Sequence, residues 1–137
     1  MIWVRRAHLV FAWAFVAGVV VQVFLAGLGV FESSSRFGTH AGWGFLLGLL
    51  TIPLAILGGI GVGRRQALYG AALFGMFALQ SILVTFRDRN PAVAALHPVN
   101  GFAILLVSIV MAREAWATRS QPVTPSPLPQ PAQEAAR

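Results

Sequence analysis

The chain has 137 residues, of which 57% are hydrophobic and only 10% charged, whereas roughly a quarter of the residues in a soluble domain are charged. Its mean hydropathy of +0.74 is typical of a membrane protein. The arginines fall between apolar runs and form no basic face, which argues against a nucleic-acid partner. Because there is no cysteine, disulfides, iron–sulfur clusters, thiolate zinc sites and covalently attached haem are excluded.

Four apolar segments, at about 8–31, 40–62, 67–86 and 92–112, are each close to the ~20 residues that a helix needs to cross a bilayer. None has Asp, Glu or Arg in its interior. We therefore predict an all-α fold, a four-helix transmembrane bundle over residues 1–117, with the lipid bilayer as its surroundings. Residues 118–137 are rich in Pro, Ser and Gln, and we predict that they form a disordered cytoplasmic tail.

The arginines also predict the orientation of the bundle. Seven of the ten fall on the side of the two termini and the 64–65 loop, and three, Arg36, Arg87 and Arg89, fall on the other. By the positive-inside rule, both termini are predicted to be cytoplasmic. The expected location is the bacterial plasma (inner) membrane, which the chain crosses several times.

The two halves of the chain share a pattern. His-x-x-x-Gly-Phe occurs at 40–45 and again at 97–102, and a glutamine precedes each histidine, Gln22 by eighteen residues and Gln80 by seventeen. Each half contains two spans, so the halves have the same topology. We predict a parallel duplication about an axis along the membrane normal.

The histidines of this pattern, His40 and His97, begin the second and fourth spans and should lie at similar depth. Two neutral imidazoles in an apolar bundle can serve as the two axial ligands of a b-type haem. Zinc and dinuclear sites require cysteines or carboxylates, which the spans lack. Since residues i and i+4 share a helix face, Gly44, Gly48 and Gly101 are predicted to leave room for the porphyrin.

Other polar groups have candidate roles around this haem. Gln22 and Gln80 are predicted partners of the imidazoles, with plain interhelical hydrogen bonding as the alternative. The three arginines Arg36, Arg87 and Arg89, with the nearby helix N-termini, are predicted to hold the propionates. The histidines could instead cap helices, and the glycines could serve helix packing. His8, beside two arginines, and Trp43 are predicted to be interfacial side chains.

The body of the chain resembles an uncharacterised family of short four-helix bacterial membrane proteins. The resemblance rests on Q-V-F-L-A-G-L-G at Gln22–Gly29 and L-H-P-V-N-G at Leu96–Gly101. The arrangement is also similar to one half of haem A synthase, whose four-helix halves place haem-ligating histidines on their second and fourth helices. That resemblance implies His40 and His97 as axial ligands. The chain has one such half and no carboxylate within the membrane, which weakens any inference of haem oxidation.

The predicted function is therefore a membrane haem b protein, active in electron transfer or as a haem-carrying subunit, and no residue is assigned a catalytic role. The alternative is a non-redox accessory subunit of a larger respiratory or photosynthetic complex, or a homodimer, whose histidines bind a chlorophyll-type pigment or nothing. A small exporter is disfavoured because proton coupling needs a carboxylate within the membrane.

Overall fold

The computed structural model describes residues 2–119, and within them every regular element is helical. Its four long helices are long and apolar enough to cross a membrane. The predicted all-α, four-helix membrane fold is confirmed, while the internal repeat and the orientation stay predictions. In chain order the elements are α1 (Ile2–Phe31), η1 (Ser34–Arg36), α2 (Phe37–Gly61), α3 (Arg64–Val84), α4 (Pro91–Ala94) and α5 (Leu96–Thr118).

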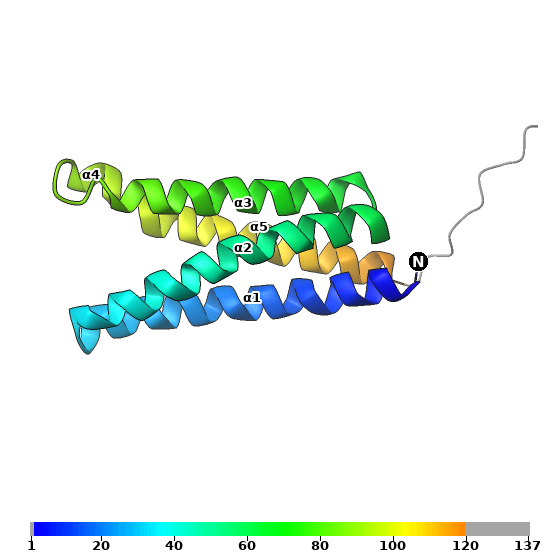
Figure 1. The fold of residues 1–137 in the computed structure, drawn as a ribbon, viewed down its shortest axis with the longest axis horizontal. Coiled ribbons are helices and arrows are strands. Elements are labelled where there is room, and N and C mark those ends of the chain that lie inside the picture. The colour runs from blue at the N-terminus through cyan, green and yellow to red at the C-terminus, as the bar shows by residue number, and fades with distance from the viewer. Residues whose placement is uncertain (1, 120–137) are drawn as a thin grey trace, which may run out of the picture.

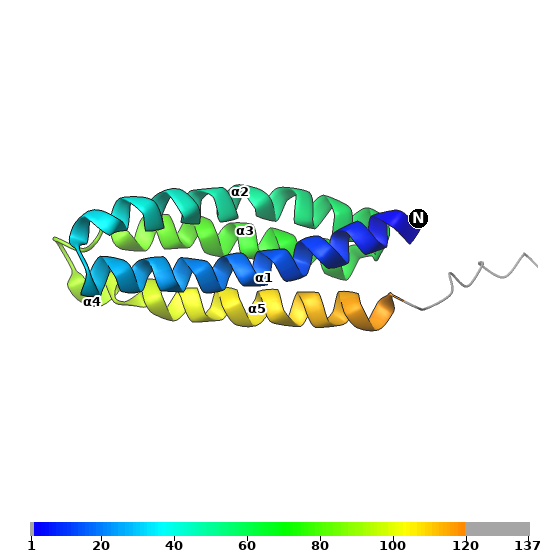
Figure 2. The ribbon, with the colours of Figure 1, turned by 90° about the horizontal axis from the view of Figure 1, so that it is seen from below.

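The long helices run up and down the bundle (Figures 1 and 2). Helices α1 and α3 each pack beside α2 and α5, so α1 faces α3 across one diagonal and α2 faces α5 across the other. The α1–α2 connection and the α3–α5 connection, residues 32–36 and 85–95, lie at one end, which we call the loop end. The α2–α3 turn and both ends of the described chain lie at the opposite, terminal end.

The helices are longer than the apolar spans at several ends. The predicted spans end where the apolar residues end. Arginine is a good helix former, so a helix can continue through it past the apolar region. Thus α1 includes Arg5 and Arg6, and α5 continues through Arg113 to Thr118. The fourth predicted span is divided, because Asn90 caps the short α4 by accepting a hydrogen bond from the Val93 amide before α5 begins. From residue 120 onward, the predicted tail lies outside the described residues.

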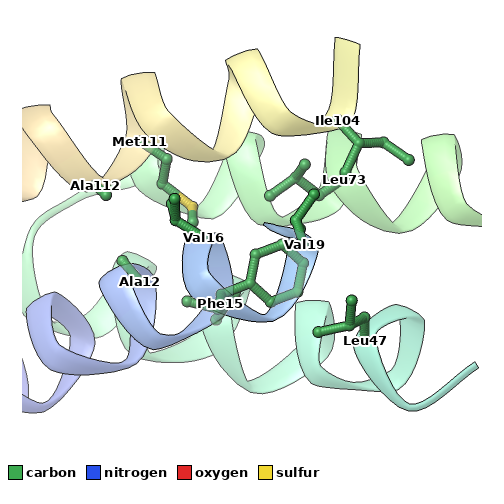
Figure 3. Close-up of a cluster of buried hydrophobic side chains, with 10 residues drawn as sticks. Ala12, Phe15, Val16, Val19, Leu47, Leu73, Ile104, Met111 and Ala112 are labelled. Atoms are coloured by element: carbon green, nitrogen blue, oxygen red, sulfur yellow. The ribbon is translucent and has the colours of Figure 1, made fainter. Parts of the chain in front are cut away.

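The middle of the bundle is a packed apolar core to which all four long helices contribute (Figure 3). Helix α1 supplies most of it, with Ala12, Phe15, Val16 and Val19, against side chains such as Leu47 of α2. The outward faces are also apolar, as lipid contact requires. This core fixes the helix positions, and the interhelical hydrogen bonds of the three histidines lie toward its two ends.

Candidate functional site

The two histidines of the repeated pattern meet near the bundle axis at the loop end. His40 lies in the first turn of α2 and His97 in the first turn of α5. Because these helices face each other across a diagonal, the imidazole rings approach with centroids 6.1 Å apart and planes inclined at 59°. Both side chains are partly buried. The sequence placed both residues at the same depth, and the structure brings them together.

Each imidazole is fixed by a backbone carbonyl of the neighbouring helix. His40 Nδ1 lies 3.1 Å from the carbonyl oxygen of Gln22, and His97 Nδ1 lies 3.2 Å from that of Gln80. A carbonyl oxygen can only accept, so in both rings Nδ1 carries the proton and Nε2 carries a lone pair. Histidines that bind metals commonly have this arrangement, since the carbonyl fixes both the tautomer and the ring orientation.

The two glutamine side chains behave differently from each other. The Gln22 amide nitrogen lies 3.3 Å from His40 Nε2, to which it donates, and its Oε1 is buried without a hydrogen-bond partner. In the other half, Gln80 Oε1 accepts from Asn100 Nδ2 at 2.9 Å. The backbone contacts of the two halves therefore match, whereas the side-chain contacts do not.

A second pair of equivalent contacts lies one turn further into the bundle. Trp43 Nε1 donates to the Gly18 carbonyl at 2.9 Å, and Asn100 Nδ2 donates to the Met76 carbonyl at the same distance. Each donor follows its histidine by three residues, and each acceptor precedes its glutamine by four. Trp43 is partly buried and its indole joins α2 to α1, while its place at the membrane interface stays a prediction.

The predicted porphyrin-clearing glycines lie close to other side chains. A Cβ on Gly44 would lie 2.6 Å from the amide nitrogen of Gln22, and one on Gly101 would lie 3.5 Å from that of Gln80. A Cβ on Gly48 would lie 3.4 Å from Phe77 Cβ of α3. The space above Gly44 and Gly101 thus holds glutamine amides, which must turn aside before a flat macrocycle can enter.

The three loop-end arginines, Arg36, Arg87 and Arg89, are exposed. Arg36 pairs with Glu32 one turn earlier, with Nε 2.9 Å from the carboxylate, and Arg87 lies 3.3 Å from the carboxylate of the adjacent Asp88. Within residues 2–119, Arg89 is not paired with a carboxylate. Two of the three predicted propionate partners, Arg36 and Arg87, therefore already have a nearby anion.

His8 does not lie at the interface as predicted. It is fully buried, and its Nε2 donates to Gln66 Oε1 of α3 at 3.0 Å, across the α1–α3 diagonal at the terminal end. A Cβ on Gly58 would lie 2.9 Å from both the His8 ring and Gln66 Cβ, so this glycine admits the pair. His8 is buried because its side chain faces α3 across the bundle, where Gly58 of α2 leaves room for the ring.

In the described part of the chain, this site offers a metal two imidazole nitrogens, one from His40 and one from His97. Among residues 2–119 there is no cluster of three or more His, Cys, Asp or Glu side chains. The described residues define a helical protein of the multi-pass membrane type, with two imidazoles facing each other at one end of the bundle.

Residues 22–86, just under half of the chain, match a family of unknown function, DUF6220. This match is consistent with the predicted resemblance to an uncharacterised family of short membrane proteins. It begins at Gln22 and includes His40 and Gln80, but it ends before His97. No curated protein and no solved structure matches the chain.

Proposed function

We propose that this protein binds haem b at the loop end, with His40 and His97 as axial ligands, and serves in electron transfer or as a haem-carrying membrane subunit. On this proposal it lies in the bacterial plasma membrane with both termini in the cytoplasm. The observation that carries the proposal is the pair of Nε2 lone pairs on two imidazoles held across the bundle axis.

The spacing of the rings supports a shared metal ion. An imidazole nitrogen binds a metal at about 2 Å, and roughly 1 Å more separates that nitrogen from its ring centre, so two rings on opposite sides of one ion lie about 6 Å apart. The centroids of His40 and His97 are 6.1 Å apart. The separation of the two rings therefore matches that of two imidazoles that share one ion.

The number and charge of the ligands support haem over other metal groups. A structural zinc ion takes four protein ligands, and calcium or magnesium takes oxygen ligands. A porphyrin supplies four nitrogens itself, so two neutral imidazoles complete the coordination of its iron. Bound haem would supply a one-electron iron couple.

The chain's own residues would determine how this group is held. The Gln22 and Gln80 carbonyls orient the two rings. A low dielectric and neutral axial ligands are the features by which a protein adjusts a haem's reduction potential. Arg89, which has no carboxylate partner within the described residues, is the most available of the loop-end arginines for a propionate.

The proposal is tested by purifying the protein in mild detergent after growth with added haem and recording its visible spectrum. We expect a Soret band and one haem per chain, and His40→Ala and His97→Ala should each change the band. Free imidazole added to a His97→Gly variant should restore the six-coordinate spectrum. His8→Ala removes the third histidine, at the other end of the bundle, and should keep the band.

Several results would overturn this assignment. If the protein is colourless after growth with haem, it binds no haem. If it has a Soret band that does not change in variants at both His40 and His97, haem binds at another site. Copper in place of iron would leave the two-imidazole site but exclude haem.

One observation favours the second candidate, a non-redox accessory subunit of a larger membrane complex. The amides of Gln22 and Gln80 fill the space above Gly44 and Gly101, so the bundle closes without a cofactor. A colourless protein that co-purifies with a larger membrane complex would support this reading.

A further inference from the structure

The two ends of the bundle carry very different charge. At the loop end, three arginines lie with two carboxylates, Glu32 and Asp88, and each carboxylate is paired with a neighbouring arginine. At the terminal end, residues 2–119 contribute six arginines and one carboxylate, Glu114. We call the six the terminal arginine cluster, and they lie at the start of α1, the start of α3 and the end of α5: Arg5, Arg6, Arg64, Arg65, Arg113 and Arg119.

Two members of this cluster bond within the protein and hold the helix ends together. Arg65 Nη2 donates to the Glu114 carboxylate at 2.6 Å, which joins α3 to α5. The Tyr69 hydroxyl donates to the same carboxylate at 3.0 Å. Arg5 Nε donates to the Gly61 carbonyl at 2.7 Å, which joins α1 to α2. The one carboxylate of this end is therefore already shared between two donors.

Three other members of the cluster can bind an anion from outside the protein. Arg6, Arg64 and Arg113 are exposed, and none of them is paired with a carboxylate of residues 2–119. A guanidinium presents its N–H donors in a planar fork that matches two oxygens of a phosphate. These three side chains can therefore bind phosphate without breaking an ion pair of the fold.

Two exposed tryptophans on the neighbouring helices α1 and α5 indicate that the phosphate belongs to a lipid. The Arg6 guanidinium lies 5.4 Å from the centre of the Trp3 ring. The Arg119 guanidinium lies 4.0 Å from the centre of the Trp116 ring. Indole rings are enriched at the membrane–water interface, at the level of the lipid headgroups, and a cation over the ring is stabilised there. A soluble acidic partner would account for the arginines but not for the exposed indoles beside them.

We propose that the terminal arginine cluster binds anionic phospholipid in the membrane leaflet at the terminal end. Arg6, Arg64 and Arg113 bind the lipid phosphates, and the indoles of Trp3 and Trp116 lie against the glycerol and the upper part of the acyl chains. The lipid carries a net negative charge, because the cationic group of a zwitterionic headgroup is repelled by the arginines. This binding is separate from the proposed haem site, which lies at the other end of the bundle.

The test measures which lipids stay bound to the full chain. The protein is reconstituted in bilayers with equal amounts of phosphatidylglycerol and phosphatidylcholine and extracted in mild detergent, and the retained lipids are counted by native mass spectrometry. We expect the wild type to retain phosphatidylglycerol in excess. A triple variant, Arg6→Gln, Arg64→Gln and Arg113→Gln, should lower the ratio of phosphatidylglycerol to phosphatidylcholine at least about fivefold, the effect of one arginine at an anionic surface.

The matched control removes the same charge from the loop end, by glutamine at Arg36, Arg87 and Arg89, and should leave the ratio close to that of the wild type. Equal losses in the two triple variants would show that only net charge matters and would refute the site, as would equal retention of the two lipids by the wild type. Displacement of the lipid by excess inorganic phosphate would indicate an anion site that does not recognise lipid. The wild type alone gives an independent check, because salt screens exposed charges: an excess of phosphatidylglycerol that does not fall with added salt would also overturn the proposal.

Discussion

Alanine at Gly44 and at Gly101 should have different effects, although the two glycines occupy the same position in the repeated pattern. The new methyl group at residue 44 would lie 2.6 Å from the Gln22 amide nitrogen, whereas at residue 101 it would lie 3.5 Å from that of Gln80. Ordinary contact begins near the second distance. Gln22 must therefore retreat by roughly 1 Å, which breaks its 3.3 Å bond to His40, and Gln80 need not move.

The expected magnitude follows from that single hydrogen bond. Its net contribution is about 1 kcal/mol, which corresponds to about a fivefold change in an equilibrium. Gly44→Ala should therefore shift the equilibrium of the Gln22–His40 hydrogen bond about fivefold toward the broken form, and in protein with ¹⁵N-labelled histidine it should move the Nε2 resonance of His40. Gly101→Ala should leave the Nε2 resonance of His97 unchanged.

The assay is a ¹⁵N spectrum of both variants and of the wild type in the same detergent. Both alanine variants should stay folded, because the side chain that moves is the end of a flexible amide and not backbone. Equal shifts in Gly44→Ala and Gly101→Ala would refute the reasoning.

Four further predictions concern the bundle itself. Gly70→Ala places a Cβ 2.6 Å from the backbone of α2 and should lower the free energy of unfolding in mixed micelles by about 1–3 kcal/mol. As a control, a Cβ at Gly75 on the same helix meets nothing within 4 Å, so Gly75→Ala should not destabilise the bundle. Gln66→Leu removes the residue to which His8 donates and should cost about 0.6–1.7 kcal/mol in the same assay. A single cysteine at Ser34 should react with an impermeant reagent only from outside the cell, and reaction only from the cytoplasm would reverse the predicted orientation. Replacing all three loop-end arginines with alanine should weaken haem retention mildly, since exposed pairs contribute about 0–1 kcal/mol each, and unchanged retention would remove their propionate role.

The sequence was sufficient to predict the helices and the meeting of the histidines. Apolar length alone predicts four spans, and two histidines that begin spans on the same side must lie at similar depth. Gln22 and Gln80 were predicted as the partners of those histidines, and both rings do bond to these residues, but the atoms that make the contacts could not be predicted. His40 and His97 bond to backbone carbonyls, which every residue carries, and the equivalent donors Trp43 and Asn100 are different residue types with no common sequence signal.

The position of His8 was mispredicted for a different physical reason. In a soluble helix, the polar side marks the outer face, so hydrophobic periodicity tells which residues point inward. In a helix surrounded by lipid the outer face is as apolar as the inner one, and α1 accordingly exposes Val20 and Phe24 while it buries Phe15 and Val16. Nothing in the sequence of α1 therefore indicated that His8 faces Gln66.

The histidine contacts at the two ends of the bundle differ in which ring nitrogen is left as an acceptor, and this difference favours the proposed site at the loop end. At the terminal end, Gln66 Oε1 accepts from His8 Nε2, so that ring carries its proton on Nε2 and has its lone pair on Nδ1, close to its own backbone. At the loop end, backbone carbonyls hold the protons on Nδ1, so Nε2 is the acceptor nitrogen in both rings. Interhelical hydrogen bonds fix helix register at both ends, but the two rings with an Nε2 acceptor, 6.1 Å apart, lie together at the loop end.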